Sequence, residues 1–302
     1  MFVLKGDFFM YYISKTSYNN LTYSIDMLRL KTYITYDIYS NLDFYLRTYY
    51  RDKIEKFWIS DRIMQFKYNF KIEIEEGIGF YLGFHHNNEN DEKYLEKGLH
   101  NLTVEFNPNK VKDNNILRHI LGLSGEWCIK NYDLAVDMKC NILDIIFDKG
   151  RKKCLHTFSN GGDDITYNIG KGDLRLKIYN KKRESKLDIQ GDLTRIEISR
   201  ELEDFPIKDV KLLNWGLNNF PELYINNYMC SFNDYNNKTM LPIIYAVQNG
   251  FPINDLSRRY KEKIKKLFEG GQKIKFTDKD ATEVLRQTIF RYFMKNDKVR
   301  WR

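Results

Sequence analysis

Tyr179 ends an alternating segment, "DLRLKIY" (173–179), and the basic block "NKKRES" follows it directly. Arg175, Lys177 and Tyr179 would point to the same side of a strand, because residues two apart share a face. A tyrosine hydroxyl acts as a covalent nucleophile when a neighbouring positive charge or a metal favours the phenolate. The segment is therefore a candidate for attack by tyrosine on an acidic group. Since Tyr179 is one of 22 tyrosines, a packing role is the alternative.

Four carboxylates stand at similar positions on three other alternating segments, "NLTVEF" (101–106), "NYDLAVDM" (131–138) and "LTRIEIS" (193–199). Each lies opposite the apolar residues of its segment, and the four are Glu105, Asp133, Asp137 and Glu197. Clustered carboxylates repel one another, and Mg²⁺ or Mn²⁺, which prefers oxygen ligands, relieves that repulsion. Such a cation also stabilises the charge that develops when a hydroxyl attacks phosphorus. If these segments share a sheet, their residue types suit metal-assisted phosphoryl transfer to Tyr179.

The same alternation has a simpler explanation, because any sheet with one solvated face carries polar residues in this pattern. The neighbouring His85 and His86 are not expected to bind a metal together, since adjacent strand residues point to opposite faces. The pattern alone therefore leaves a catalytic surface and an ordinary solvated surface both open.

The sequence predicts an α+β fold, with a large, mainly antiparallel sheet and flanking helices, followed by a helical C-terminal region. Alternating strands are expected at 22–34, 68–75, 78–86, 101–106, 131–138, 164–170, 173–179 and 193–202, and helices at 113–123 and 141–149. The "GKGD" at 170–173 predicts a hairpin in which Gly170 or Gly172 takes a positive φ. Further helices are expected at 207–217, 236–250, 254–271 and 278–297. The chain is therefore divided into a strand-rich part, 1–205, and a helical part, 206–302.

The helix expected at 254–271 has an apolar stripe and a basic face. Asn254 or Asp255 is the expected N-cap, and Gly270 with Gly271 is the expected C-terminal stop. The apolar stripe contains Leu256, Tyr260, Ile264, Leu267 and Phe268. It turns five cations toward solvent, which are Arg258, Arg259, Lys261, Lys265 and Lys266. With the preceding helix, this segment could form a helix-turn-helix that binds DNA, and an ordinary solvated basic face is the alternative.

The 302-residue chain carries 49 Lys and Arg against 41 Asp and Glu, which gives a net charge of +8. This excess favours a polyanionic partner such as a nucleic acid. The four cysteines are widely spaced without a zinc-binding pattern, which is typical of a reducing compartment. No segment is apolar for the length of a membrane span. We therefore expect a soluble, cytoplasmic protein with no membrane partner.

Four motifs together resemble one known family. They are "VEFNPNK" (104–110), "YDLAVD" (132–137), "YNIGKGDLRLKIYNKKRESK" (167–186) and "LTRIEI" (193–198). In order and spacing these motifs are similar to the Rep_trans family of plasmid rolling-circle replication initiators, the dimeric type of staphylococcal plasmids. The resemblance covers about residues 22–302 and is most specific from 100 to 200.

The resemblance implies an enzyme that nicks and rejoins DNA at the plasmid double-strand origin. Tyr179, in the family's R-[IF]-Y-[DN]-K motif, would be the nucleophile that becomes joined to the 5′-phosphate, and the freed 3′-hydroxyl would prime synthesis. Tyr167 is the next candidate for this role. The family uses carboxylates with Mg²⁺ or Mn²⁺, which matches Glu105, Asp133 and Glu197 best, with Asp137 and Asp26 as further candidates. The implied partners are origin DNA, a second copy of the chain and a host helicase.

Cations near the nucleophile would hold the scissile or neighbouring phosphates, and they are Arg175, Lys177, Lys181, Lys182 and Arg183. Origin recognition would fall on the basic helix. Lys177 stands where the family usually has arginine, so the charge is kept but the bidentate grip on phosphate is lost. A relaxase of a conjugative or integrative element, or a phage initiator, would share the chemistry. A non-catalytic DNA-binding copy-control protein is the remaining alternative.

Overall fold

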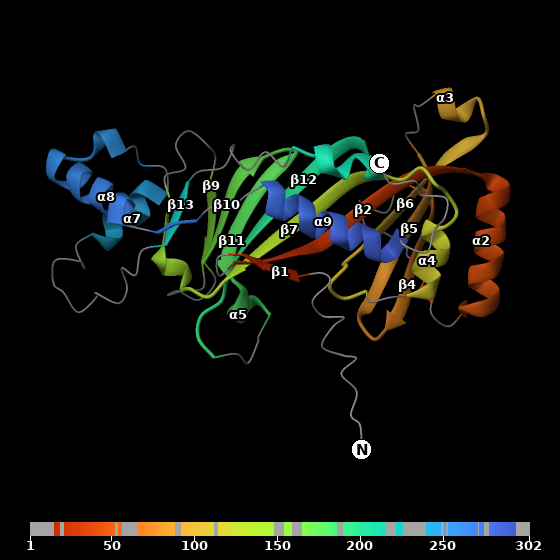
Figure 1. Ribbon diagram of the computed structural model, residues 1–302, viewed down its shortest axis with the longest axis horizontal. Coiled ribbons are helices and arrows are strands. Elements are labelled where there is room, and N and C mark those ends of the chain that lie inside the picture. Colours follow the sequence, from red (N-terminus) through yellow and green to blue (C-terminus); the bar gives the residue numbers. More distant parts are fainter. Residues whose placement is uncertain are drawn as a thin grey trace, which may run out of the picture.

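Antiparallel pairing between segments far apart in the sequence builds one large sheet in the computed structural model (Figure 1). The structure describes residues 15–18, 21–51, 54–55, 66–87, 92–111, 114–147, 154–158, 165–185, 190–214, 222–225, 240–248, 251, 253–270, 272–274 and 278–293. The sheet has 11 strands in the spatial order β3-β4-β5-β6-β2-β7-β12-β11-β10-β9, and β1 pairs with β2 outside this path. The predicted α+β class is confirmed.

The strands of this sheet agree closely with the alternating segments of the sequence. They are β1 (Lys15–Tyr18), β2 (Leu21–Thr35), β3 (Ile54–Glu55), β4 (Phe66–Glu75), β5 (Ile78–His86), β6 (Leu99–Phe106), β7 (Cys128–Met138), β9 (Cys154–Phe158), β10 (Ile165–Lys171), β11 (Leu174–Asn180) and β12 (Thr194–Pro206). The hairpin between β10 and β11 has Gly170 at φ 94° and Gly172 at φ 80°, as the "GKGD" segment predicts. A side chain at either φ would be strained, so glycine suits this turn.

Three helices share a hydrophobic core with the apolar face of the sheet. They are α2 (Tyr36–Tyr49), α4 (Asn115–Leu121) and α9 (Asp278–Phe293), and α9 crosses the sheet over β2 (Figure 1). On α9, Leu285 and Ile289 are fully buried, and burial of such a side chain stabilises the fold by about 1.5–3 kcal/mol. The Tyr292 hydroxyl donates a hydrogen bond of 2.5 Å to the Val111 carbonyl oxygen. The last helix therefore packs on the sheet, and the division of the chain at 205/206 stays a prediction.

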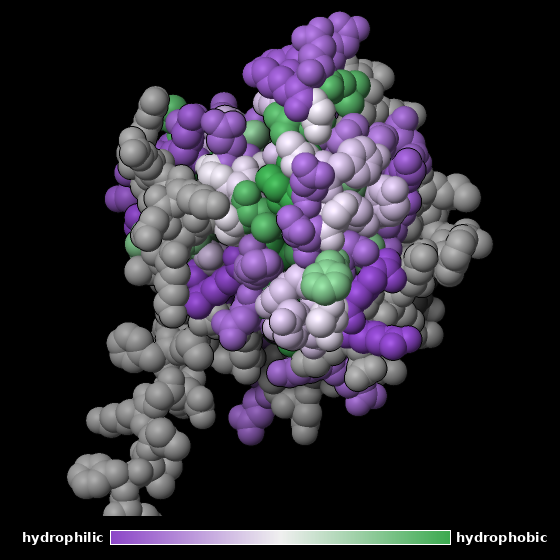
Figure 2. Space-filling view, turned by 90° about the vertical axis from the view of Figure 1, so that its right-hand side faces the viewer, coloured by the Kyte–Doolittle hydropathy of each residue, from purple (hydrophilic) through white to green (hydrophobic). Residues whose placement is uncertain are grey.

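The helix α2 was not expected from the sequence. Thr35 caps its N-terminus by accepting a hydrogen bond of 3.4 Å from the Ile38 backbone N–H. Tyr39, Leu42 and Leu46 form its buried stripe. Figure 2 shows the end of the molecule where α2 lies, and hydrophobic colour there is confined to small areas among hydrophilic residues. None of the described helices is long and apolar enough to cross a membrane.

Two of the expected helices are wrong. Residues 141–149 contain a 3₁₀ turn, η3 (Ile142–Asp144), followed by β8 (Ile145–Phe147), because this short apolar run is buried by pairing with β13 (Leu223–Ile225). A short apolar run fits a buried strand as well as a helix, so its pattern alone could not decide. In the segment 207–217 only the 3₁₀ helix η4 (Ile207–Leu212) forms within the described residues. A second small sheet joins β8, β13 and β14 (Gln272–Lys273).

Two helices near the C-terminus form a separate small hydrophobic cluster. They are α7 (Leu241–Gln248) and α8 (Arg258–Gly270), which pack through Met240, Ile244 and Ile264. The expected N-cap of α8 at Asn254 or Asp255 is wrong, because these residues belong to the 3₁₀ turn η7 (Ile253–Asp255). Instead the Ser257 carbonyl oxygen accepts from the Lys261 N–H at 3.0 Å. In Figure 1 this pair of helices lies at the opposite end of the molecule from α2.

Candidate active site

Backbone pairing places polar residues of β7, β12 and β11 in adjacent rows on one face of the sheet. From β7 through β12 to β11, the three rows are Asp137, Arg195, Tyr179, then Ala135, Glu197, Lys177, and then Asp133, Ser199, Arg175. The apolar residues between them alternate to the other face and join the core. The register therefore gathers Tyr179, its neighbouring cations and three of the four acids singled out from the sequence on one surface.

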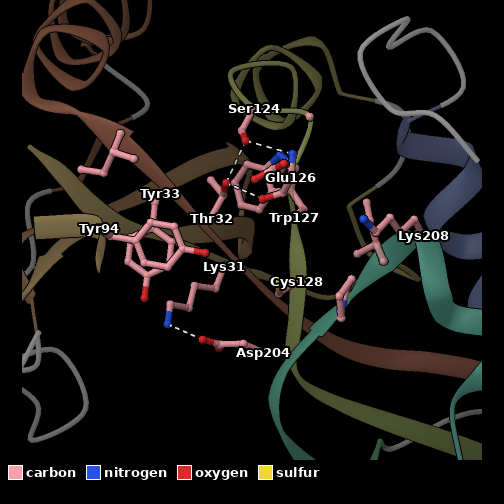
Figure 3. Close-up of a pocket in the computed structure, with 14 residues that line it drawn as sticks. Lys31, Thr32, Tyr33, Tyr94, Ser124, Glu126, Trp127, Cys128, Asp204 and Lys208 are labelled. Atoms are coloured by element: carbon pink, nitrogen blue, oxygen red, sulfur yellow. Dashed lines mark hydrogen bonds and ion pairs between the residues drawn. The ribbon is translucent and has the colours of Figure 1, made fainter. Parts of the chain in front are cut away.

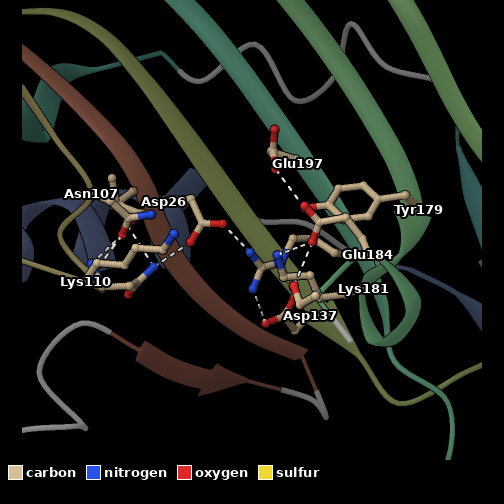
Figure 4. A network of polar contacts seen from close by, with 12 residues as sticks. Asp26, Asn107, Lys110, Asp137, Tyr179, Lys181, Glu184 and Glu197 are labelled. Atoms are coloured by element: carbon tan, nitrogen blue, oxygen red, sulfur yellow. Dashed lines mark hydrogen bonds and ion pairs between the residues drawn. The ribbon is translucent and has the colours of Figure 1, made fainter. Parts of the chain in front are cut away.

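Arg195 joins two acids from two other strands (Figure 4). Its Nε and Nη2 atoms donate to the Asp137 carboxylate at 2.6 and 2.7 Å, and its Nη1 atom donates to Asp26 on β2. Asn109 donates a further hydrogen bond of 2.6 Å to the other Asp26 oxygen. Burial lowers the pKa of Arg195, but the hydrogen bond to Asp137 and the charge of Asp26 outweigh this effect and raise it. The three central strands therefore meet at a permanently charged arginine that is 5% exposed.

The Tyr179 hydroxyl donates a hydrogen bond of 3.0 Å to Glu197 Oε2 (Figure 4). The tyrosine is only 3% exposed. Burial and the negative charge of Glu197 raise the pKa of Tyr179, and the nearby Arg195 only partly opposes them. Burial and Glu197 therefore oppose the phenolate, and the expectation that neighbouring cations favour it stays a prediction. Glu197 is in a position to accept the phenol proton.

Two lysines lie against the ring of Tyr179. The Lys177 Nζ atom is 4.3 Å from the ring centre, and Lys181 Nζ is 5.7 Å from it. Lys181 begins the short helix α5 (Lys181–Glu184) and forms an ion pair of 2.7 Å with Glu184. Both distances are within the range of cation–π attraction. Positive charge therefore surrounds the aromatic ring, although it does not hydrogen-bond to the hydroxyl oxygen.

The remaining cations of the predicted phosphate-binding set lie around this centre. Arg175 and Arg183 are exposed, and Lys182 Nζ donates a hydrogen bond of 3.1 Å to the Gly191 carbonyl oxygen. An exposed guanidinium keeps its donors accessible to a phosphate. Their positions are compatible with DNA contacts, and that role stays a prediction.

Asp133 has an unusual environment for a carboxylate. Burial raises its pKa to about 6, and the charges of Glu197 and Asp26 add to this effect. A hydrogen bond with Ser199 and the charge of Arg175 oppose it. The acids on this surface therefore repel one another, and Arg195 does not neutralise them completely.

Glu105 lies apart from these acids and has its own cation. The Arg29 Nε atom donates to Glu105 Oε2 at 2.7 Å, and the two side chains are 26% and 24% exposed. In register, Arg29 lies between Glu105 on β6 and Asn131 on β7. Glu105 is thus on the same face of the sheet and is held by an arginine.

The donor set can be tested against a hard divalent cation. Within the part of the chain that the structure describes, no three His, Cys, Asp or Glu side chains are grouped so that they could hold a metal. Glu105 and Asp137 are paired with arginines, whereas Asp133 and Glu197 form no ion pair with described residues. Ser24 lies opposite Ala135, and its buried Oγ atom has no hydrogen-bond partner among the described residues. Mutually repelling carboxylates beside an unsatisfied oxygen fit the chemistry of Mg²⁺ or Mn²⁺. The prediction of a metal at all four acids stays a prediction.

Tyr167, the alternative nucleophile, is on the opposite face of the sheet. It pairs with Ile178 in register, is 1% exposed, and packs edge-to-face against Phe147 with ring centres 5.3 Å apart.

The two neighbouring histidines, His85 and His86, have separate partners. His85 stacks on His100 with ring centres 4.4 Å apart, and His86 contacts the ring of Phe66.

The basic face expected on α8 is present. Arg258, Arg259 and Lys265 are exposed and Lys261 is half-buried. Arg258 forms an exposed ion pair of 3.1 Å with Glu262. Binding of this face to DNA stays a prediction.

Sequence reasoning missed the roles of Arg195 and Asn109. Arg195 precedes Glu197 by two residues and so shares its face, which was a usable signal. Asn109 comes from the loop after β6, and nothing in its local pattern indicates that it reaches Asp26.

No known family profile matches this chain, and no curated protein does. Among solved structures, the chain is similar to the rolling circle replication initiator protein from Geobacillus stearothermophilus. The sequence identity is 14%, the comparison covers 76% of this chain and 97% of that chain, and the TM-score is 0.41.

Proposed function

We propose that the chain is a rolling-circle replication initiator that nicks and rejoins DNA through a covalent 5′-phosphotyrosine. The observation that carries this proposal is the Tyr179 hydroxyl bonded at 3.0 Å to the Glu197 carboxylate, with Lys177 against its ring. The sequence motifs around Tyr179 support the same chemistry. A purely structural or DNA-binding surface has no need for repelling acids around a buried tyrosine.

The reaction follows from the positions of these groups. Tyr179 Oη attacks the phosphorus atom, its proton passes to Glu197, and the P–O3′ bond breaks. The departing 3′-oxygen takes a proton from solvent, and the 5′ side of the strand stays joined to tyrosine. Lys177 and Arg175 would offset the phosphate charge. The reverse reaction rejoins the strand without an external energy source, because the phosphodiester is exchanged rather than hydrolysed.

Asp133 and Glu197 would hold a divalent cation at this site. Glu197 accepts the tyrosine hydrogen bond with one of its two carboxylate oxygens, Oε2. Bound Mg²⁺ or Mn²⁺ would supply positive charge to the phosphoryl oxygens. Asp26 is the next acid that influences Asp133, but it is already engaged by Arg195.

Asp133→Asn is expected to abolish the stabilisation of the protein by Mn²⁺. A ligand that binds only the folded state at 100 times its Kd stabilises it by about 2.7 kcal/mol. The measurement is the thermal unfolding midpoint with increasing MnCl₂, which requires no DNA. Glu105→Gln is the control and should keep the Mn²⁺ effect, because Arg29 already occupies Glu105. An undiminished Mn²⁺ effect in Asp133→Asn would exclude Asp133 as a ligand.

The proposal as a whole is tested by the covalent product. The protein is incubated with a supercoiled plasmid that carries its gene and the flanking DNA, in the presence of Mg²⁺ or Mn²⁺. We expect open-circular plasmid and protein that stays attached to DNA in detergent. After nuclease digestion, mass spectrometry should find the residual nucleotide on the peptide that contains Tyr179.

Two results would contradict the proposal. Nicking without any attached protein would indicate hydrolysis, and an adduct on another residue would move the nucleophile. Transfer-origin DNA as substrate separates a relaxase from a replication initiator. The proposed homodimer and the host helicase stay predictions.

A further inference from the structure

A cavity of about 500 Å³ opens beside β2 where β7 begins (Figure 3). It is lined by residues of β2, of the loop before β7 and of the end of β12. Lys31 and Tyr33 line it and follow Arg29 at two-residue steps, so they share the sheet face of the Arg29–Glu105 pair. Its volume is in the range of sites that enclose a small organic group.

One wall of the cavity is a stacked pair of tyrosines (Figure 3). The rings of Tyr33 and Tyr94 are 3.7 Å apart at their centres and inclined by 12°. Tyr94 belongs to the short helix α3 (Glu92–Leu95), and both side chains are partly exposed. The Lys93 Nζ atom lies over the ring of Tyr94, 4.8 Å from its centre, so the pair carries a mobile cation that a base would have to displace. Aromatic rings flanked by cations are surfaces on which proteins bind unpaired nucleobases, because every base has a π-face.

The charges around the cavity favour an anion. Lys31 and Lys130 share Asp204, with Nζ–O distances of 2.7 and 3.3 Å. Lys208 lines the opposite side and is exposed. Three lysines therefore oppose two acids, Asp204 and Glu126, and Lys31 also lies 4.7 Å from the ring centre of Tyr33. This combination of positive charge with aromatic rings is typical of grooves that bind single-stranded nucleic acid.

The backbone of β12 is distorted where it forms the cavity wall. The pairing of β12 with β7 shifts between Glu201 and Phe205, and Asp204 has a φ of 46°. Positive φ is uncommon for a residue other than glycine, and aspartate is among the residues that tolerate it. The irregularity puts the Asp204 carboxylate within 2.7 Å of Lys31. Bulges that redirect a side chain in this way are frequent next to functional sites.

Strand β12 runs from this cavity to Glu197, the hydrogen-bond partner of Tyr179. Glu197 and Asp204 are seven residues apart on β12, so at about 3.3 Å per residue they lie at most roughly 23 Å apart, and the irregularity between Glu201 and Phe205 shortens this distance. A DNA strand that rises 3.4 Å per nucleotide covers that distance in about seven nucleotides, and an extended strand needs fewer. One single strand can therefore reach both places.

From these observations we infer that the cavity binds one unstacked base of the strand being nicked, with the base against the Tyr33–Tyr94 pair and a neighbouring phosphate near Lys208. This inference rests on the proposed function, because it assumes that the strand attacked by Tyr179 is single-stranded at the site. It assigns a base-binding subsite about seven nucleotides or fewer from the scissile phosphate.

The test is the binding of fluorescein-labelled single-stranded oligothymidylates to the full chain, measured by fluorescence anisotropy. Tyr94→Ala should weaken binding of a 15-nucleotide strand about tenfold, which is the loss of one stacked base. Tyr94→Phe should keep wild-type affinity, because it retains the ring. Tyr49→Ala is the control, since Tyr49 is 68% exposed on α2 and lies outside the cavity. Thermal unfolding checks that each variant is folded.

Strand length gives a second measurement. Lengthening the oligothymidylate from three to 15 nucleotides should raise the affinity of the wild type more than that of Tyr94→Ala, because only the longer strand reaches both Tyr179 and the cavity. Equal affinities of Tyr94→Ala and Tyr49→Ala for the 15-nucleotide strand would overturn the inference, as would a loss in Tyr94→Phe equal to that in Tyr94→Ala.

The same experiments separate the two proposals. If the wild type forms no adduct with Tyr179 but Tyr94→Ala still weakens binding selectively, the proposed function fails and the base site stands. If the adduct forms and Tyr94→Ala changes nothing, the base site fails and the proposed function stands.

Discussion

Tyr179→Phe is expected to reduce nicking and covalent attachment by at least about a thousandfold, since loss of a covalent nucleophile leaves only binding and positioning. Phenylalanine keeps the ring against Lys177, so DNA affinity should change little. The measurement is the fraction of supercoiled plasmid nicked per minute, together with the amount of DNA-linked protein. Both quantities should fall, whereas the DNA affinity measured by fluorescence anisotropy should stay at its wild-type value.

Tyr81→Phe is the matched control for this substitution. Tyr81 is on β5, it pairs with Glu105 in register, and its hydroxyl donates to Asn69. It is therefore another hydrogen-bonded tyrosine on the polar face of the same sheet, but it is remote from Glu197. Normal nicking in Tyr81→Phe with none in Tyr179→Phe would support the assignment. Residual adduct in Tyr179→Phe would require another nucleophile.

Arg195→Met is expected to lower the free energy of unfolding by about 3–5 kcal/mol, the range measured when one partner of a buried ion pair is removed. The substitution leaves Asp26 and Asp137 facing each other with little solvent to screen them, since Arg195 itself is 5% exposed. Chemical denaturation with urea measures the loss directly. Activity is also expected to fall, because these two acids would no longer be held in place.

Arg29→Met provides the comparison. Its pair with Glu105 has the same residue types, but the two side chains are about a quarter exposed, at 26% and 24%. Partly solvated ion pairs contribute about 0–1 kcal/mol, so this variant should lose much less stability. A loss in Arg195→Met no greater than that in Arg29→Met would contradict the view that Arg195 holds three strands together.

The sheet was predictable because alternation is a local property of the sequence. In "NYDLAVDM" and "LTRIEIS", buried residues such as Leu134 and Ile196 fall at every second position, and this spacing also determines which side chains share the opposite face. The strand order was not predictable, since β2 pairs with β6 across 64 to 78 residues and with β7 across 97 to 117 residues. The convergence of Asp133 and Glu197 therefore depended on pairing that no local pattern contains.

The electrostatics of the site were harder to predict than its residues. Sequence reasoning placed Lys177 beside Tyr179 but could not weigh that cation against the burial of the phenol and the contact with Glu197. It also ranked Glu105 with Asp133 and Glu197 and could not foresee that Arg29 holds Glu105 as Arg195 holds Asp137. The helix predicted at 141–149 was wrong for a related reason, because pairing with the distant strand β13 makes part of this segment a strand.

The hydrogen bond between Tyr179 and Glu197 also bears on how long the proposed covalent intermediate would last. A phenol whose pKa is raised is a poor leaving group as a phenolate, so departure of tyrosine from phosphorus requires return of the proton held by Glu197. The linkage would then survive until a 3′-hydroxyl is aligned for attack and Glu197 is protonated. The half-buried Glu197 carboxylate would in this way keep the strand end attached while synthesis proceeds.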